Sequence, residues 1–172
     1  MLYQTNKELL PEIQHYGCNF LALLRSKEVL RGFVWTPTLV NDAWANCVKA
    51  GAISGDLNGD GDVDDQGEAE VLSYPRLFEV LDLPLKEIPL DLMPMKWKVA
   101  DFGGVKRLAP LPEPADKTKW WILERWVWRI GHFVQGDGTG KAWPFFDAVP
   151  GGSLTRRYGK IESIRAFGIR GI

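Results

Sequence analysis

Hydrophobic positions in the first half of the chain recur at the spacing of amphipathic helices. Residues 18–30, CNFLALLRSKEVL, form an apolar run that begins directly after Gly17, so they predict a helix with Cys18 in its first turn. Residues 74–83, YPRLFEVLDL, predict a shorter helix. The first half of the chain is therefore expected to be mainly helical.

The segment TPTLVNDAWANCVKAG, which starts at Thr36, predicts a helix with recognisable ends. Thr36 or Thr38 can cap its N-terminus, and Pro37 suits its first turn. Gly51 ends it. One face of this helix collects the apolar positions Val40, Ala43, Trp44, Cys47 and Val48. Cys47 is therefore expected to be a core residue.

The pattern changes along the second half of the chain. Residues 84–116 are rich in proline and predict loops with a short strand near Trp97–Ala100. After Asp116, short runs of β-branched and aromatic residues alternate with glycine-rich turns, which is typical of antiparallel strands. Helices followed by an antiparallel sheet make an α+β fold, and we expect one domain over residues 1–172.

Composition narrows the classes of function. Hydrophobic residues make up 45% of the chain and charged residues 25%, with a net charge of -1, so no general attraction to nucleic acid or to anionic membranes is expected. The opening MLYQTNKELLPEIQ lacks the basic and apolar regions of a signal peptide, and no apolar run approaches the ~18 to 20 residues of a membrane span. We expect a cytoplasmic protein, unless another system exports it.

A possible catalytic constellation follows from a few residue types. His15 and His132 are the two histidines of the chain. The segment GHFVQGDGTGKAWPFFD predicts a hairpin that brings Asp147, near the end of one strand, back beside His132, near the start of the other. A cysteine nucleophile needs such a base and an orienting acceptor. The helix N-terminus favours a thiolate at Cys18, and the Gln14 amide can donate to an oxyanion.

Each of these residues also has a structural interpretation. Cys18 can be a small residue at a helix start, and His132 a hydrogen-bonded strand histidine. Asp147 can cap the turn before AVPGG, and Gln14 can be a solvated helix residue. The catalytic hypothesis depends on all four residues occurring in an order that suits one mechanism.

The order of these motifs resembles that of papain-like cysteine peptidases. The matching features are Gln14 with Gly17-Cys18 at a helix start, GHFV on a strand, and Asp147 before VPGG. The chain is most similar to the C39-like group, which includes the bacteriocin-leader peptidases of export transporters. It also resembles small phage or prophage proteins of uncharacterised function with that fold. The similarity in the order of elements covers residues 4–170.

This resemblance implies N-terminal helices packed on a C-terminal antiparallel sheet and hydrolysis of an amide bond by a thiol. It assigns Cys18 as nucleophile, His132 as general base and acid, Asp147 as the orienting acid and Gln14 as the oxyanion donor. The expected substrate is a peptide or a peptidoglycan-type amide. The alternative is an inactive papain-like module that binds or regulates a partner.

The acidic stretch of residues 55–68 has the spacing of an EF-hand-like calcium loop. Asp56, Asn58 and Asp60 stand at positions one, three and five, and Gly61 supplies the turn at position six. Position twelve is Gly67, with an acid one residue later. Oxygen ligands of this kind favour Ca²⁺. The expected ligands are Asp56, Asn58, Asp60, the Asp62 carbonyl, and Glu68 or Asp64.

The calcium is expected to be structural, and a solvated acidic turn is the alternative. A further alternative function comes from the eight tryptophans of the chain, since aromatic side chains can form sugar-binding platforms. Tryptophans also fill protein cores, which is the interpretation that we favour.

Overall fold

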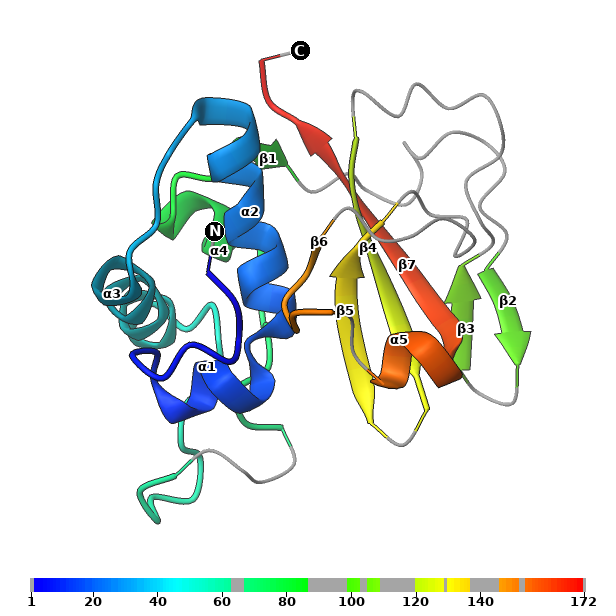
Figure 1. Ribbon diagram of the computed structural model, residues 1–172, viewed down its shortest axis with the longest axis horizontal. Coiled ribbons are helices and arrows are strands. Elements are labelled where there is room, and N and C mark those ends of the chain that lie inside the picture. The colour runs from blue at the N-terminus through cyan, green and yellow to red at the C-terminus, as the bar shows by residue number, and fades with distance from the viewer. Residues whose placement is uncertain are drawn as a thin grey trace. The chain divides into compact units, whose positions relative to one another are not determined.

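The computed structural model describes residues 2–62, 67–86, 99–102, 105–108, 120–128, 130–136, 146–151 and 154–171. The chain divides into two compact units, residues 1–84 and 85–172. The first unit contains helices and the second contains an antiparallel sheet, which confirms the α+β class (Figure 1).

The first unit contains four helices among its described residues. They are α1 (Pro11–Tyr16), α2 (Cys18–Arg31), α3 (Pro37–Lys49) and α4 (Tyr74–Val80). The structure confirms the three predicted helices, and α1 was not predicted. α1 packs against α2, and α3 packs against α4. In the core, the rings of Phe20 and Trp44 meet edge to face with their centroids 5.1 Å apart, a favourable geometry for two aromatic side chains.

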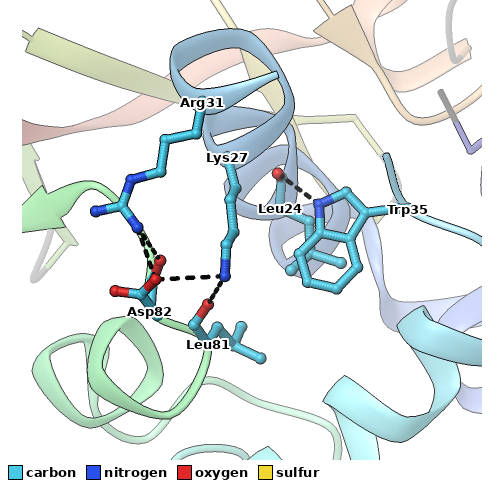
Figure 2. Close-up of polar contacts among 6 residues, drawn as sticks. All are labelled: Leu24, Lys27, Arg31, Trp35, Leu81 and Asp82. Carbon is cyan, nitrogen blue, oxygen red and sulfur yellow. Dashed lines mark hydrogen bonds and ion pairs between the residues drawn. The ribbon is translucent and has the colours of Figure 1, made fainter. Parts of the chain in front are cut away.

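Polar contacts attach the last turns of α2 to the end of α4 (Figure 2). Lys27 Nζ donates a hydrogen bond of 2.8 Å to the carbonyl oxygen of Leu81. Arg31 Nη1 lies 2.6 Å from the Asp82 carboxylate. Asp82 adopts a left-handed backbone with φ of 46°, a conformation that costs free energy for a residue other than glycine. The two cations of α2 therefore hold the chain in the tight turn that follows α4.

The second unit contains seven strands and one short helix among its described residues. They are β1 (Leu85–Lys86), β2 (Val99–Phe102), β3 (Val105–Leu108), β4 (Trp120–Val127), β5 (Gly131–Gln135), β6 (Phe146–Asp147), α5 (Leu154–Tyr158) and β7 (Lys160–Ile169). Five of them form an antiparallel sheet in the order β1-β7-β4-β5-β6 (Figure 1). β2 and β3 form a separate antiparallel pair.

Two of the predicted strand features are present. The strand expected near Trp97–Ala100 is β2, which begins at Val99. The predicted hairpin is the antiparallel pair of β5 and β6, in which Val134 lies opposite Asp147. β1, β3 and α5 were not predicted, because elements of two to five residues carry too few positions for a periodic pattern.

Candidate functional site

His132 and Asp147 form a buried hydrogen-bonded pair. His132 Nε2 lies 2.7 Å from Asp147 Oδ1, and the two residues are only 6% and 9% exposed. The pair exists because Val134, two residues after His132, lies opposite Asp147 across β5 and β6. Residues two apart on a strand share a face, so His132 and Asp147 are diagonal neighbours on the same side of the sheet.

The contact with Asp147 determines which ring nitrogen of His132 is left to accept a proton. An ionised carboxylate only accepts hydrogen bonds, so the bond to Oδ1 places a proton on Nε2. Nδ1 is then the nitrogen that accepts a proton from another group. Orientation of an imidazole by a buried carboxylate is what a nucleophile–base–acid triad requires.

Asp147 also has the structural role that its sequence context suggests. The same Oδ1 atom accepts a hydrogen bond of 2.9 Å from the backbone N–H of Val149. This is the bond of an aspartate that stabilises a turn two residues ahead. The two roles are therefore combined in one atom, and the turn fixes the carboxylate that orients His132.

Cys18 is the first residue of α2 and belongs to the helical unit, residues 1–84. It is 8% exposed. Gly17 connects α1 to α2, and a Cβ atom there would lie 2.5 Å from the carbonyl oxygen of Ile13. The next residue, Asn19, donates a hydrogen bond of 2.9 Å to the hydroxyl of Tyr74 on α4. The start of α2 is therefore held closely at both sides of Cys18.

Gln14, the expected oxyanion donor, lies on α1 and is half-buried. Its side-chain nitrogen donates a hydrogen bond of 2.6 Å to the carbonyl oxygen of Leu9. A primary amide carries two N–H donors. One of them is used in this contact, so a role in holding an oxyanion would depend on the other.

Cys47 is a core residue, as the pattern of α3 predicts. Its side chain is fully buried, and desolvation raises the pKa of Cys47 from 9.0 to about 12. The neutral thiol is inert as a nucleophile. The two cysteines of the chain are not joined in a disulfide.

The acidic loop is organised around Asp56. Its two carboxylate oxygens accept hydrogen bonds from the backbone N–H groups of Gly59, at 2.6 Å, and Gly61, at 2.8 Å. Gly59 and Gly61 have φ of 79° and 95°, which a side chain would disfavour. Glu68 is buried, and its Oε1 accepts the backbone N–H of Leu57 at 2.6 Å. The carboxylates of Asp56 and Glu68 therefore stabilise the loop by accepting hydrogen bonds from its backbone N–H groups.

The inner ligands predicted for calcium lie side by side within this loop. Asn58 Nδ2 donates a hydrogen bond of 2.9 Å to Asp60 Oδ2, and Asp60 Oδ1 accepts the backbone N–H of Asp62 at 3.2 Å. Asp64 lies outside the described residues. Within the described parts of the chain, no group of three or more His, Cys, Asp or Glu side chains has the arrangement of a metal centre.

Glu124 and Trp126 were not among the predicted site residues, although they lie on the same sheet as His132. Glu124 is 1% exposed and accepts a hydrogen bond of 3.0 Å from the indole nitrogen of Trp126. The sequence WWILERWV of β4 shows no regular alternation of apolar and polar residues, because both faces of this strand carry buried side chains. In the sequence, the spacing of two residues places Glu124 and Trp126 on the same face of a strand. That this face is also the face of His132 depends on the register of β4 with β5.

Several tryptophans are core residues, which agrees with the favoured interpretation of their number. The buried ones among the described residues are Trp35, Trp44, Trp121 and Trp126. Trp128 is 44% exposed, and its ring centroid lies 5.5 Å from that of Tyr158. No helix of the described residues has both the length and the hydrophobicity to cross a membrane.

Comparisons with protein families, with curated proteins and with solved structures found no match to this chain. Its function is therefore inferred from the chemistry of the residues described above.

Proposed function

We propose that this protein is a thiol hydrolase, a papain-like cysteine peptidase or amidase that cleaves a peptide or a peptidoglycan-type amide. The observation that carries the proposal is the buried contact of 2.7 Å between His132 Nε2 and Asp147 Oδ1. An imidazole oriented in this way is a competent general base. Cys18, at the start of a 14-residue helix, is the proposed nucleophile, because a helix N-terminus favours a negative charge.

In the proposed reaction, His132 Nδ1 takes the proton of the Cys18 thiol, and the thiolate attacks the carbonyl carbon of the amide. The backbone N–H of Cys18 and the second amide hydrogen of Gln14 hold the oxyanion. His132 returns the proton to the amine as the C–N bond breaks, which leaves a thioester on Cys18. Water then attacks the thioester and passes its proton through His132 to the departing sulfur, which regenerates the thiol.

The proposal is tested by the pH dependence of alkylation of Cys18 with iodoacetamide. The experiment uses the Cys47→Ala background, with and without His132→Ala, and Cys18→Ala as the blank. We expect iodoacetamide to alkylate Cys18 readily at neutral pH, and His132→Ala to abolish this reactivity, because the thiolate is the reactive form. If Cys18 is alkylated at the same rate at every pH with and without His132→Ala, the hydrolase proposal is wrong.

The second candidate function is a binding or regulatory module of phage origin, with the same fold, a calcium-stabilised loop and no turnover. It is favoured by the acidic loop, whose carboxylates are organised by backbone hydrogen bonds at Asp56 and Glu68. Carboxylate, amide and carbonyl oxygens in an EF-hand-like spacing suit Ca²⁺. The residues that would hold it are Asp56, Asn58, Asp60, Asp62 and Glu68. A bound ion there would hold the connection between α3 and α4 in place.

Calcium binding is tested by thermal unfolding in Ca²⁺, in Mg²⁺ and in a chelator. Ligand that binds only the folded state at 100 times its Kd adds about 2.7 kcal/mol to the free energy of unfolding, so Ca²⁺ should raise the Tm. Asp60→Asn keeps the hydrogen-bonding oxygen but removes the charge, and should lose most of the increase. Asp42→Asn, at an exposed position of α3, is the matched control. A wild-type Tm that is equal in Ca²⁺ and in chelator would exclude the calcium site.

A further inference from the structure

One face of the sheet in the second unit gathers four buried polar or aromatic residues. Trp126 on β4 lies directly opposite His132 on β5. Glu124 lies opposite Val134, and Val134 in turn lies opposite Asp147. Since alternate residues of paired strands point to the same side, these residues share one face. This face therefore holds two carboxylates beside one imidazole.

The carboxylate of Glu124 sits in a closely fitted position. It is 1% exposed, and its Oε2 accepts the indole N–H of Trp126 at 3.0 Å. At Gly136, directly after β5, an added Cβ atom would lie 2.4 Å from Glu124 Cδ and 2.5 Å from Oε1. The absence of a side chain at Gly136 thus leaves the room that the carboxylate occupies, while Trp126 supplies a donor for it.

A buried carboxylate at this place depends on hydrogen bonds from its neighbours. Removal of a charged group from water costs several kcal/mol unless hydrogen bonds compensate it, and apolar residues of similar volume often stabilise such a position better. Glu124 stands between the buried residues Leu123 and Trp126 on a strand that is otherwise mainly apolar. At such a position the hydrogen-bond partners of the carboxylate, among them the indole N–H of Trp126, decide whether the carboxylate is tolerated.

We propose that Glu124 is a positioning residue for His132. Its carboxylate holds the indole of Trp126 through the indole N–H, and the indole, across the strand pair from His132, confines the imidazole to the orientation in which Nε2 meets Asp147. This role matters for catalysis only if the proposed hydrolase function is correct. The positioning itself concerns only residues of β4, β5 and β6.

The test measures the tautomer of the His132 ring, that is, which ring nitrogen carries the proton, by ¹⁵N NMR. The chain has two histidines, so each spectrum contains two imidazoles. His15 is exposed on α1 and serves as the internal control. In the wild-type protein at a pH where the imidazole is neutral, we expect His132 to carry its proton on Nε2, as the contact with Asp147 requires.

Three variants separate the hydrogen bond from the charge and from packing. Glu124→Gln retains an oxygen that can accept the indole N–H. Glu124→Leu removes the acceptor, and Trp126→Phe removes the donor but keeps an aromatic ring. We expect Glu124→Gln to keep the wild-type tautomer ratio. The other two variants should raise the Nδ1–H share about fivefold, because the indole that confines the imidazole loses a hydrogen bond worth about 1 kcal/mol.

The outcomes decide the proposal in each case. It is overturned if Glu124→Leu or Trp126→Phe folds with the wild-type tautomer ratio, or if Glu124→Gln loses that ratio as fully as Glu124→Leu. Should Glu124→Leu fail to fold, Trp126→Phe and Glu124→Gln carry the test alone. The circular dichroism of each variant and an unchanged His15 signal establish that the comparison is made between folded proteins.

Failure of the positioning role and failure of the hydrolase proposal give different results. If the His132 tautomer ratio changes with Glu124 as expected but His132→Ala leaves the alkylation of Cys18 unchanged, the hydrolase proposal is wrong and the positioning role is supported. If alkylation of Cys18 depends on His132 while the His132 tautomer ratio is unchanged by substitution of Glu124, the positioning role is wrong and the hydrolase proposal is supported.

Discussion

The imidazole of His132 and the carboxylate of Asp147 are 15 residues apart in the chain and 2.7 Å apart in space. The oxygen that contacts the imidazole also accepts the backbone N–H of Val149. One atom thus joins the strand that carries the histidine to the turn that follows β6. Substitution of Asp147 can therefore separate its charge from its hydrogen bonds, because asparagine retains an acceptor oxygen without the charge.

The first prediction concerns Asp147→Asn and Asp147→Ala. Asparagine keeps an oxygen for the N–H of Val149 but lacks the charge, so the pH midpoint at which His132 titrates should fall, because the imidazolium loses its negative partner. Alanine should lower this midpoint as well and reduce the free energy of unfolding by about a further 1 kcal/mol, through loss of the turn bond. NMR titration and urea unfolding measure the two effects. An unchanged His132 midpoint in Asp147→Asn would contradict the pairing.

The second prediction concerns the stability of the protein at alkaline pH. Burial raises the pKa of Cys47 from 9.0 to about 12, so between these values the unfolded chain has lost the thiol proton while the folded protein retains it. The unfolded state then binds fewer protons, and stability falls as the pH rises through this window. Urea unfolding below and within the window should show a smaller decrease for Cys47→Ala than for the wild type. Parallel decreases in the two proteins would contradict the raised pKa.

The third prediction concerns the N-terminus of α3. Thr36 caps this helix, with its side-chain oxygen accepting the N–H of Leu39 at 3.3 Å. Thr36→Ala should therefore lower the free energy of unfolding by about 1 kcal/mol. Thr38→Ala is the matched control, since Thr38 is an exposed residue inside the helix and its replacement by a better helix former should be neutral or slightly stabilising. Equal losses in urea unfolding would exclude the cap.

The fourth prediction concerns the glycine before Cys18. A Cβ atom at Gly17 would lie 2.5 Å from the Ile13 carbonyl oxygen and 2.7 Å from its Cγ2 atom, so Gly17→Ala should destabilise the protein by about 1 to 3 kcal/mol through displacement of the helix start. It should also change the alkylation rate of Cys18.

Gly32→Ala is the comparison for this substitution. Gly32 ends α2 with φ of 66°, and an added Cβ atom there would meet no atom within 4 Å. Alanine at this position should therefore cost about 1 kcal/mol from backbone strain and leave Cys18 unaffected. If Gly17→Ala has the stability and the alkylation rate of the wild type, α1 and α2 do not need a glycine at their junction.

The sequence alone predicted α2, α3 and α4, because each of these helices combines a periodic apolar face with a recognisable start or end. The hairpin of His132 and Asp147 was also predictable, since a glycine-rich turn between two runs of β-branched and aromatic residues specifies antiparallel pairing. The burial of Cys47 followed from its place on the apolar face of α3. These features depend on residues close to one another in the chain.

Other features were decided by the tertiary structure alone. The choice of Thr36 over Thr38 as the cap depends on the backbone geometry at the helix start. β7, the last strand, lies inside the sheet between β1 and β4, a long-range pairing that no local pattern encodes. The burial of Glu124 opposite Val134 depends on the register of β4 with β5. Local periodicity determines which segments form helices or hairpins, whereas only pairing between distant strands determines which polar side chains share one buried face.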